Sequence, residues 1–86
     1  MPPKVIKVNL IPDYKLELLF SSGELKLFNV KPYLKYQVYK ILTNTWADTK
    51  PYLCNGTVCL DENGFIDFDP DILYLESEVI SKKQNA

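Results

Sequence analysis

Four carboxylate residues near the end of the chain have the spacing of a calcium-binding loop. Such a loop takes oxygen ligands from positions 1, 3, 5 and 12. Those positions are held here by Asp67, Asp69, Asp71 and Glu78. The same loop needs glycine at position 6 for its sharp turn, whereas this chain has Ile72 there and Pro70 inside the loop. We therefore expect no calcium ion at these carboxylates.

A strand followed by a capped helix explains the same residues better. Asp69 fits the N-cap position, and Pro70 fits the first helical position, where its missing N–H leaves no hydrogen bond unmade. Asp71 then places a negative charge in the first turn, which the helix dipole favours. Residues 72–74, Ile-Leu-Tyr, continue as a short packed helix.

The two cysteines, Cys54 and Cys59, offer little chemistry in a chain that has no histidine. Two thiolates do not complete the four ligands of a structural zinc site. A disulfide is disfavoured in the cytosol, and a reactive thiol needs a lowered pKa. We therefore expect both cysteines to be reduced, with no metal bound and no redox or nucleophilic role.

The remaining catalytic constellations are also missing from the sequence. Serine has no imidazole to activate it, and turns and a helix start account for the carboxylates. The three glycines, Gly23, Gly56 and Gly64, lie too far apart to form a phosphate-binding loop. The sequence predicts a protein that is not an enzyme and that carries no cofactor.

One segment interleaves aromatic and basic side chains and is the candidate interaction surface. Its members are Lys31, Tyr33, Lys35, Tyr36, Tyr39 and Lys40. Such side chains can stack on nucleic-acid bases or dock an acidic peptide. The alternative, which we favour for this segment taken alone, is a helix whose tyrosines are half-buried while its lysines extend into water.

Composition and charge limit the function classes further. A chain of 86 residues with 47% hydrophobic residues suits one small domain. Its first 50 residues carry eight lysines and four carboxylates, and the rest carry two lysines and seven carboxylates. All basic residues are lysine, which lacks the guanidinium fork used to read bases, so sequence-specific nucleic-acid binding is disfavoured. We see no membrane span and no signal peptide, and expect a cytoplasmic protein.

The pattern of the first half of the chain predicts three strands, which would position the candidate interaction surface. Residues 5–11, 14–20 and 25–30 have the composition of strands, and the first two alternate apolar and polar residues. Matching the buried sets places Leu10 opposite Leu16 and Val8 opposite Leu18. The same register places Ile6 opposite Phe20. It also requires an odd-length connection or a bulge at residues 12–14.

The second half predicts a helical middle and a hairpin. Residues 33–42 place Leu34, Val38, Ile41 and Leu42 at helical spacing. Residues 43–53 show no clear pattern, although Trp46 suits the core. Val58 and Leu60 are expected to face Phe68 and Ile66 across a three-residue loop, residues 62–64, with Gly64 left-handed.

Several of these motifs occur together in a family of short bacterial proteins of unknown function, domain of unknown function 2442. The motifs are Pro-Asp-Tyr at 12–14, Ser-Gly-Glu at 22–24, the strand at 64–68 and Asp-Pro-Asp-Ile-Leu-Tyr at 69–74. The chain resembles this family over residues 3–76. It departs in having Phe68 where tryptophan is usual and in lacking a polar insertion after that strand. The resemblance implies a compact α+β domain without an established activity, often encoded beside small genes that resemble toxin–antitoxin pairs.

Together these observations predict a small single-domain α+β fold. It has an antiparallel N-terminal three-stranded meander, a helical middle, and a C-terminal β-hairpin followed by a short helix. The domain is expected over residues 3–78, with a flexible tail over 79–86. We expect a non-catalytic protein-interaction module, the antitoxin-like or accessory half of a small operon pair, with weak nucleic-acid binding through residues 31–40 as the alternative. The sequence defines neither the protein partner nor the oligomeric state.

Overall fold

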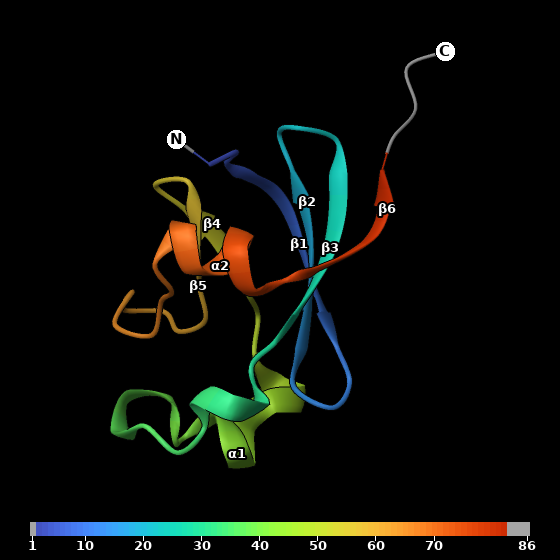
Figure 1. Cartoon of the computed structure of the whole chain (residues 1–86). Coiled ribbons are helices and arrows are strands. Elements are labelled where there is room, and N and C mark those ends of the chain that lie inside the picture. Colours follow the sequence, from blue (N-terminus) through green and yellow to red (C-terminus); the bar gives the residue numbers. More distant parts are fainter. Residues whose placement is uncertain (1, 83–86) are drawn as a thin grey trace.

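The computed structural model of the chain describes residues 2–82 and contains a four-stranded antiparallel sheet. The meander consists of β1 (Val5–Ile11), β2 (Lys15–Phe20) and β3 (Glu24–Asn29). A further strand, β6 (Glu78–Lys82), pairs with β3 and gives the order β1-β2-β3-β6 (Figure 1). The predicted meander is therefore confirmed. Residues 79–82, which the sequence assigned to a tail, lie in β6, and the rest of that tail is outside the described residues.

The register of β1 against β2 is confirmed at two of its three predicted pairs. Leu10 lies opposite Leu16 and Val8 opposite Leu18, across the expected three-residue connection. The third predicted pair, with Ile6, is wrong because the register shifts between Val5 and Lys7. This bulge places Val5 opposite Phe20 in the core and leaves Ile6 53% exposed.

The core lies on the sheet face that α2 (Pro70–Glu76) and the hairpin over residues 52–59 cover (Figure 1). Alternation along β2 and β3 turns one set of side chains inward. The fully buried side chains of the sheet and its continuation are Leu16, Leu18, Phe20, Phe28 and Val30. Leu42, Val58 and Leu73 fill the core from the covering segments.

The capped helix is confirmed as α2 (Pro70–Glu76), which has Pro70 in its first turn. The Asp69 carboxylate accepts a hydrogen bond from the backbone N–H of Asp71 at 2.8 Å. Lys26 stabilises the other end of the helix: its buried Nζ donates to the carbonyl oxygen of Tyr74 and lies 3.8 Å from the centre of that ring. The carboxylates of the calcium-like spacing are thus explained in part by a helix cap.

The prediction that the middle of the chain is helical is confirmed, but the prediction of one continuous helix over residues 33–42 is wrong. The chain forms short turns: η1 (Lys31–Tyr33), η2 (Gln37–Tyr39), α1 (Leu42–Thr45) and η3 (Trp46–Asp48). Tyr36 has an extended backbone and separates the first two. The break lets Tyr33 and Tyr39 both pack on Phe68, and this tertiary packing prevails over the helical pattern. Trp46 is buried, as predicted.

A hairpin that the sequence analysis did not predict pairs β4 (Tyr52–Cys54) with β5 (Thr57–Cys59) across Asn55 and Gly56. Both turn residues have positive φ, 49° and 81°, as a tight two-residue hairpin turn requires. The predicted register after β5 also holds, because Leu60 N–H donates to Ile66 O at 2.8 Å and Cys59 bridges Asp67. Gly64 has φ 74°, as expected. Among the described residues, however, 64–68 form only this bridge and no regular strand.

A disulfide joins Cys54 and Cys59, so the expectation of reduced cysteines is wrong. That expectation rested on an assumed compartment, whereas pairing depends on geometry. Cys54 and Cys59 lie diagonally across β4 and β5, with their Cα atoms 6.2 Å apart. This distance is within the usual range for a disulfide.

Candidate functional site

The six candidate residues lie in the segment that closes one end of the molecule, beside the turn between β1 and β2 (Figure 1). Two of them point inward. The Tyr39 ring stacks on Phe68 with the ring centroids 4.7 Å apart, and the Tyr33 ring lies 5.5 Å from Phe28. Tyr33 and Tyr39 therefore belong to the margin of the core, as the helix alternative anticipated for the tyrosines.

Hydrogen bonds fix both hydroxyl groups toward the α2 side of the molecule. Tyr33 donates to the carboxylate of Glu76, and Tyr39 donates to the backbone oxygen of Asp67 at 2.7 Å. Burial and the Glu76 hydrogen bond raise the pKa of Tyr33 to about 12. Burial, followed by the charge of Asp67, also raises the pKa of Tyr39. Both phenols are thus held neutral and act as structural donors.

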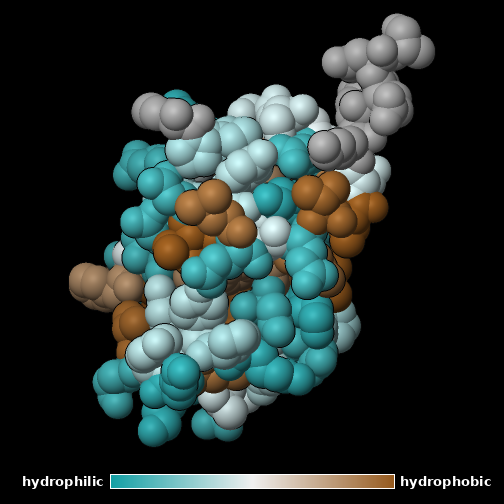
Figure 2. Space-filling view, in the orientation of Figure 1, coloured by the Kyte–Doolittle hydropathy of each residue, from teal (hydrophilic) through white to brown (hydrophobic). Residues whose placement is uncertain are grey.

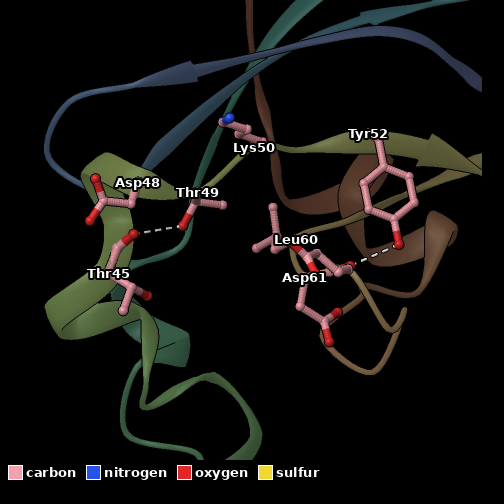
Figure 3. Close-up of a pocket in the computed structure, with 8 residues that line it drawn as sticks. Thr45, Asp48, Thr49, Lys50, Tyr52, Leu60 and Asp61 are labelled. Atoms are coloured by element: carbon pink, nitrogen blue, oxygen red, sulfur yellow. Dashed lines mark hydrogen bonds between the residues drawn. The ribbon is translucent and has the colours of Figure 1, made fainter.

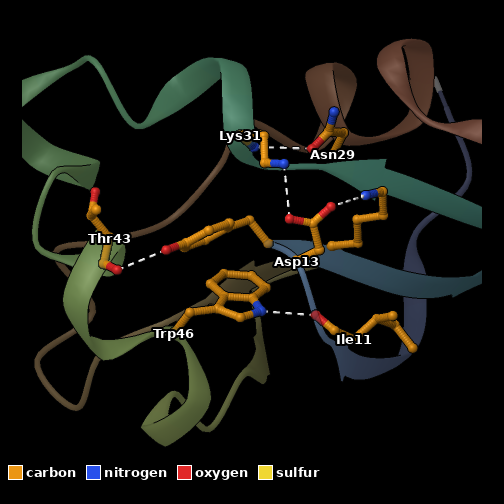
Figure 4. Close-up of polar contacts among 8 residues, drawn as sticks. Ile11, Asp13, Asn29, Lys31, Thr43 and Trp46 are labelled. Atoms are coloured by element: carbon orange, nitrogen blue, oxygen red, sulfur yellow. Dashed lines mark hydrogen bonds and ion pairs between the residues drawn. The ribbon is translucent and has the colours of Figure 1, made fainter.

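Lys31 is engaged in an ion pair at the β1–β2 turn. Its Nζ lies 2.8 Å from one carboxylate oxygen of Asp13, and Lys15 lies 3.1 Å from the other (Figure 4). Hydrogen bonds from Lys31 and then Lys15 hold the pKa of the Asp13 carboxyl below its ordinary value. Lys31 therefore links the candidate segment to the turn.

The rest of the segment is open to solvent. Tyr36 is 52% exposed, and Lys35 lies above its ring at 5.4 Å. Lys40 is also exposed. Within residues 2–82 both ion pairs involve Asp13, so neither Lys35 nor Lys40 takes part in one.

Two apolar residues that the sequence placed in the core join this open area. Val38 is 47% exposed and Ile41 is 58% exposed. Helical spacing put them on the buried face, but the extended backbone at Tyr36 changes the direction of the chain before it reaches them. We call Lys35, Tyr36, Val38, Lys40 and Ile41 the 35–41 surface.

Exposed apolar side chains also occur elsewhere, for example at Phe65 and Leu75. Figure 2 shows that on the face it presents they form small groups separated by hydrophilic residues. Exposed apolar side chains are ordinary on protein surfaces. Leu75, Val79 and Ile80 are as closely spaced along the chain as Tyr36, Val38 and Ile41. The 35–41 surface differs because its apolar side chains are interleaved with two exposed lysines, Lys35 and Lys40.

A hollow between η3 and the loop after β5 looks more like a conventional site, but several of its polar groups are hydrogen-bonded within the fold (Figure 3). The Asp61 carboxylate accepts from the backbone of Ile66 at 2.8 Å, and its carbonyl accepts from the Tyr52 hydroxyl at 2.8 Å. Thr49 donates to the carbonyl of Thr45 at 2.9 Å. Each of these hydrogen bonds stabilises one wall of the hollow.

Metal-binding clusters and membrane-spanning helices are both absent from the described part of the chain. Residues 2–82 contain no group of three or more His, Cys, Asp or Glu side chains arranged to hold a metal ion. No helix among them has the length and apolar character to cross a bilayer.

The described residues form a small α+β domain with one four-stranded sheet and one two-stranded sheet. Residues 5–78 match the family model described as protein of unknown function (DUF2442), and the chain belongs to this family. The resemblance inferred from the sequence motifs is therefore confirmed. Neither the curated proteins nor the solved structures include a match to the chain.

Proposed function

We propose that this domain is a non-catalytic protein-interaction module and that the 35–41 surface contacts the partner. The observation that carries the proposal is the exposure of Tyr36, Val38 and Ile41 together. They are interleaved with Lys35 and Lys40, neither of which forms an ion pair within residues 2–82. Interface cores are enriched in tyrosine and apolar side chains and are rimmed by polar ones. The 35–41 surface has that composition.

Burial supplies the free energy for such an interaction. Removing a Val or Ile side chain from water contributes roughly 1.5–3 kcal/mol when burial is complete. Val38 and Ile41 keep about half of their surface exposed in the isolated domain. A partner that covers them therefore gains stabilisation that the fold has left unused.

The biological setting we propose is the antitoxin-like or accessory half of a small operon pair. Support comes from the resemblance to the family and from a set of side chains with few catalytic groups. The partner of such a module is another small protein made from the same operon. Complexes of this kind rely on burial and shape more than on reactive groups.

A capture experiment with matched variants tests the proposal. The domain, Ile41→Glu and Leu75→Glu are expressed at native levels and recovered with bound proteins, with and without nuclease. Leu75 is the control because it is 74% exposed on α2, away from the 35–41 surface. We expect one stoichiometric protein with the wild type and with Leu75→Glu, but not with Ile41→Glu. Equal recovery by all three, or no partner, contradicts the proposal.

Weak nucleic-acid binding through the same surface is the second candidate. It is favoured by the exposed Tyr36 ring beneath Lys35, an arrangement suited to base stacking next to a phosphate contact. This function predicts salt-sensitive binding that the double variant Lys35→Glu/Lys40→Glu abolishes. Binding of single-stranded oligonucleotides that is unchanged in the double variant excludes it.

A further inference from the structure

A groove next to the 35–41 surface lies between the β1–β2 turn and residues 43–47. Its volume is about 520 Å³. The residues that line it include Leu10, Pro12, Tyr14, Thr43, Trp46 and Ala47. Three of these, Leu10, Tyr14 and Trp46, also pack against the core, so the groove has an apolar floor.

Hydrogen bonds fix the two aromatic rings of the floor. The Trp46 indole N–H donates to the backbone oxygen of Ile11 at 2.8 Å, and the Tyr14 hydroxyl donates to that of Thr43 at 2.7 Å. Figure 4 marks both hydrogen bonds with dashed lines. The centroids of the Tyr14 and Trp46 rings are 5.5 Å apart. Both polar ends are satisfied. Tyr14 is half-buried and supplies most of the exposed aromatic surface, while Trp46, which is 7% exposed, contributes only a small part of its ring.

The turn that forms one wall is held in an unusual conformation. Asp13 and Tyr14 are consecutive non-glycine residues with φ of 68° and 63°. Side chains with a Cβ rarely adopt this region, and such residues persist where surrounding contacts impose them. Here the contacts are the Asp13 ion pairs and a hydrogen bond from Val30 N–H to Tyr14 O at 2.8 Å. The wall is therefore preorganised, which reduces the entropy lost on binding.

Lysines outnumber carboxylates around the groove. Asp13 is the charged residue of the lining, and both of its carboxylate oxygens are paired, one with Lys15 and the other with Lys31. Asp48, the residue after Ala47, adds a second carboxylate. Lys40 adds a third lysine one turn before Thr43, whose N–H donates to Lys40 O at 3.1 Å. An acidic ligand is the complement of this distribution.

We propose that the groove holds an apolar side chain from an acidic peptide segment of the partner. This inference rests on the proposed function and specifies the kind of partner segment that the groove binds. The apolar side chain packs against Trp46 and Tyr14, while flanking carboxylates face the lysines of the turn. The segment continues from the groove onto the 35–41 surface, where Ile41 precedes Thr43 by two residues.

A displayed library of random short peptides, selected on the whole chain, tests the proposal. We expect enriched sequences that combine Asp or Glu with Phe, Leu or Trp. A synthetic copy with Phe or Leu as its apolar residue should change the fluorescence of Trp46, the only tryptophan in the chain. Binding should weaken as salt is raised.

Two matched variants locate the binding. Ala47 is exposed at the groove, so Ala47→Phe fills the space without removing a core contact. The control, Asn63→Phe, adds the same ring to an exposed loop position elsewhere. We expect affinity to fall about tenfold or more in Ala47→Phe, equivalent to loss of one good anchor, and to stay unchanged in Asn63→Phe.

The outcomes separate this proposal from the proposed function. Selection of basic or uncharged peptides, affinity that Ala47→Phe leaves unchanged, or no enrichment at all overturns the groove proposal. If a partner is still captured in a manner that Ile41→Glu abolishes, the interaction module stands without the groove. If capture fails for every variant, the proposed function itself fails. Circular dichroism of Ala47→Phe establishes that the variant is folded, and the Trp46 response of the wild type provides an independent readout.

Discussion

Strand β2 and the segment over residues 31–48 differ in how completely they bury their apolar side chains. In β2 the alternating apolar residues Leu16, Leu18 and Phe20 are fully buried. In the segment, Leu42 is buried, whereas Val38 and Ile41 from the same helical pattern remain open to water. The difference indicates that the apolar side chains of β2 stabilise the fold, while some apolar side chains of the segment are available for another role.

The largest effect should follow a change in the sheet. Leu18→Ala removes a side chain with no exposed surface and leaves a cavity. The free energy of unfolding should fall by about 2–5 kcal/mol, which is much of the stability of a domain this small. Urea denaturation measures it. A loss below about 1 kcal/mol would show that the sheet does not dominate the core.

Reduction of the disulfide should have the next largest effect. The bond closes a short loop between Cys54 and Cys59 and limits the unfolded chain, so reduction should cost about 2 kcal/mol. The β4–β5 turn chemistry should keep the hairpin formed in the folded state. Urea midpoints with and without a dithiol reductant give the value, and coincident curves would contradict it.

A high-pH effect should distinguish the inner tyrosines of the segment from its exposed residues. The fold raises the pKa of Tyr33 from 10.0 to about 12 because it buries the phenol and bonds it to Glu76. Stability from the neutral phenol is complete below pH 10 and is lost as pH rises through 12. In denaturation experiments at a series of pH values, Tyr33→Phe should lose less free energy of unfolding between pH 10 and pH 12 than the wild type does. An identical loss in both proteins would place the effect on other groups.

The smallest effect on stability should follow a change in the 35–41 surface. Ile41→Ser alters a side chain that is 58% exposed, so the free energy of unfolding should change by no more than about 0.5 kcal/mol. The same urea assay as for Leu18→Ala makes the comparison direct. A loss near that of Leu18→Ala would mean that Ile41 supports the core after all.

The same contrast explains what the sequence could predict. Period-two alternation and turn chemistry predicted the three strands of the meander, most of the β1–β2 register and the Asp69 cap, because these depend on neighbouring residues. They did not predict β4 or β6, and the strand expected at 64–68 is not regular. The bulge that exposes Ile6 adds a residue to one strand without a signal in the local pattern. A second register shift interrupts the pairing of β6, at the other sheet edge. Such irregularities discourage edge-to-edge pairing.

The candidate site was less predictable because tertiary contacts decide it. Lysine and tyrosine spacing identified the segment, and Tyr36, Lys35 and Lys40 are exposed there. Packing of Tyr33 and Tyr39 on Phe68 broke the expected helix and exposed Val38 and Ile41. The disulfide was missed for a different reason, since cysteine pairing was judged from an assumed compartment.

Hydrogen–deuterium exchange of the domain, alone and with its captured partner, tests the central claim most directly. The claim is that the 35–41 surface is left exposed in order to bind another protein. The account predicts new amide protection over residues 35–47 in the complex, with the exchange of β2 unchanged. Protection confined to the β6 edge or to α2 would contradict it and place the interface elsewhere.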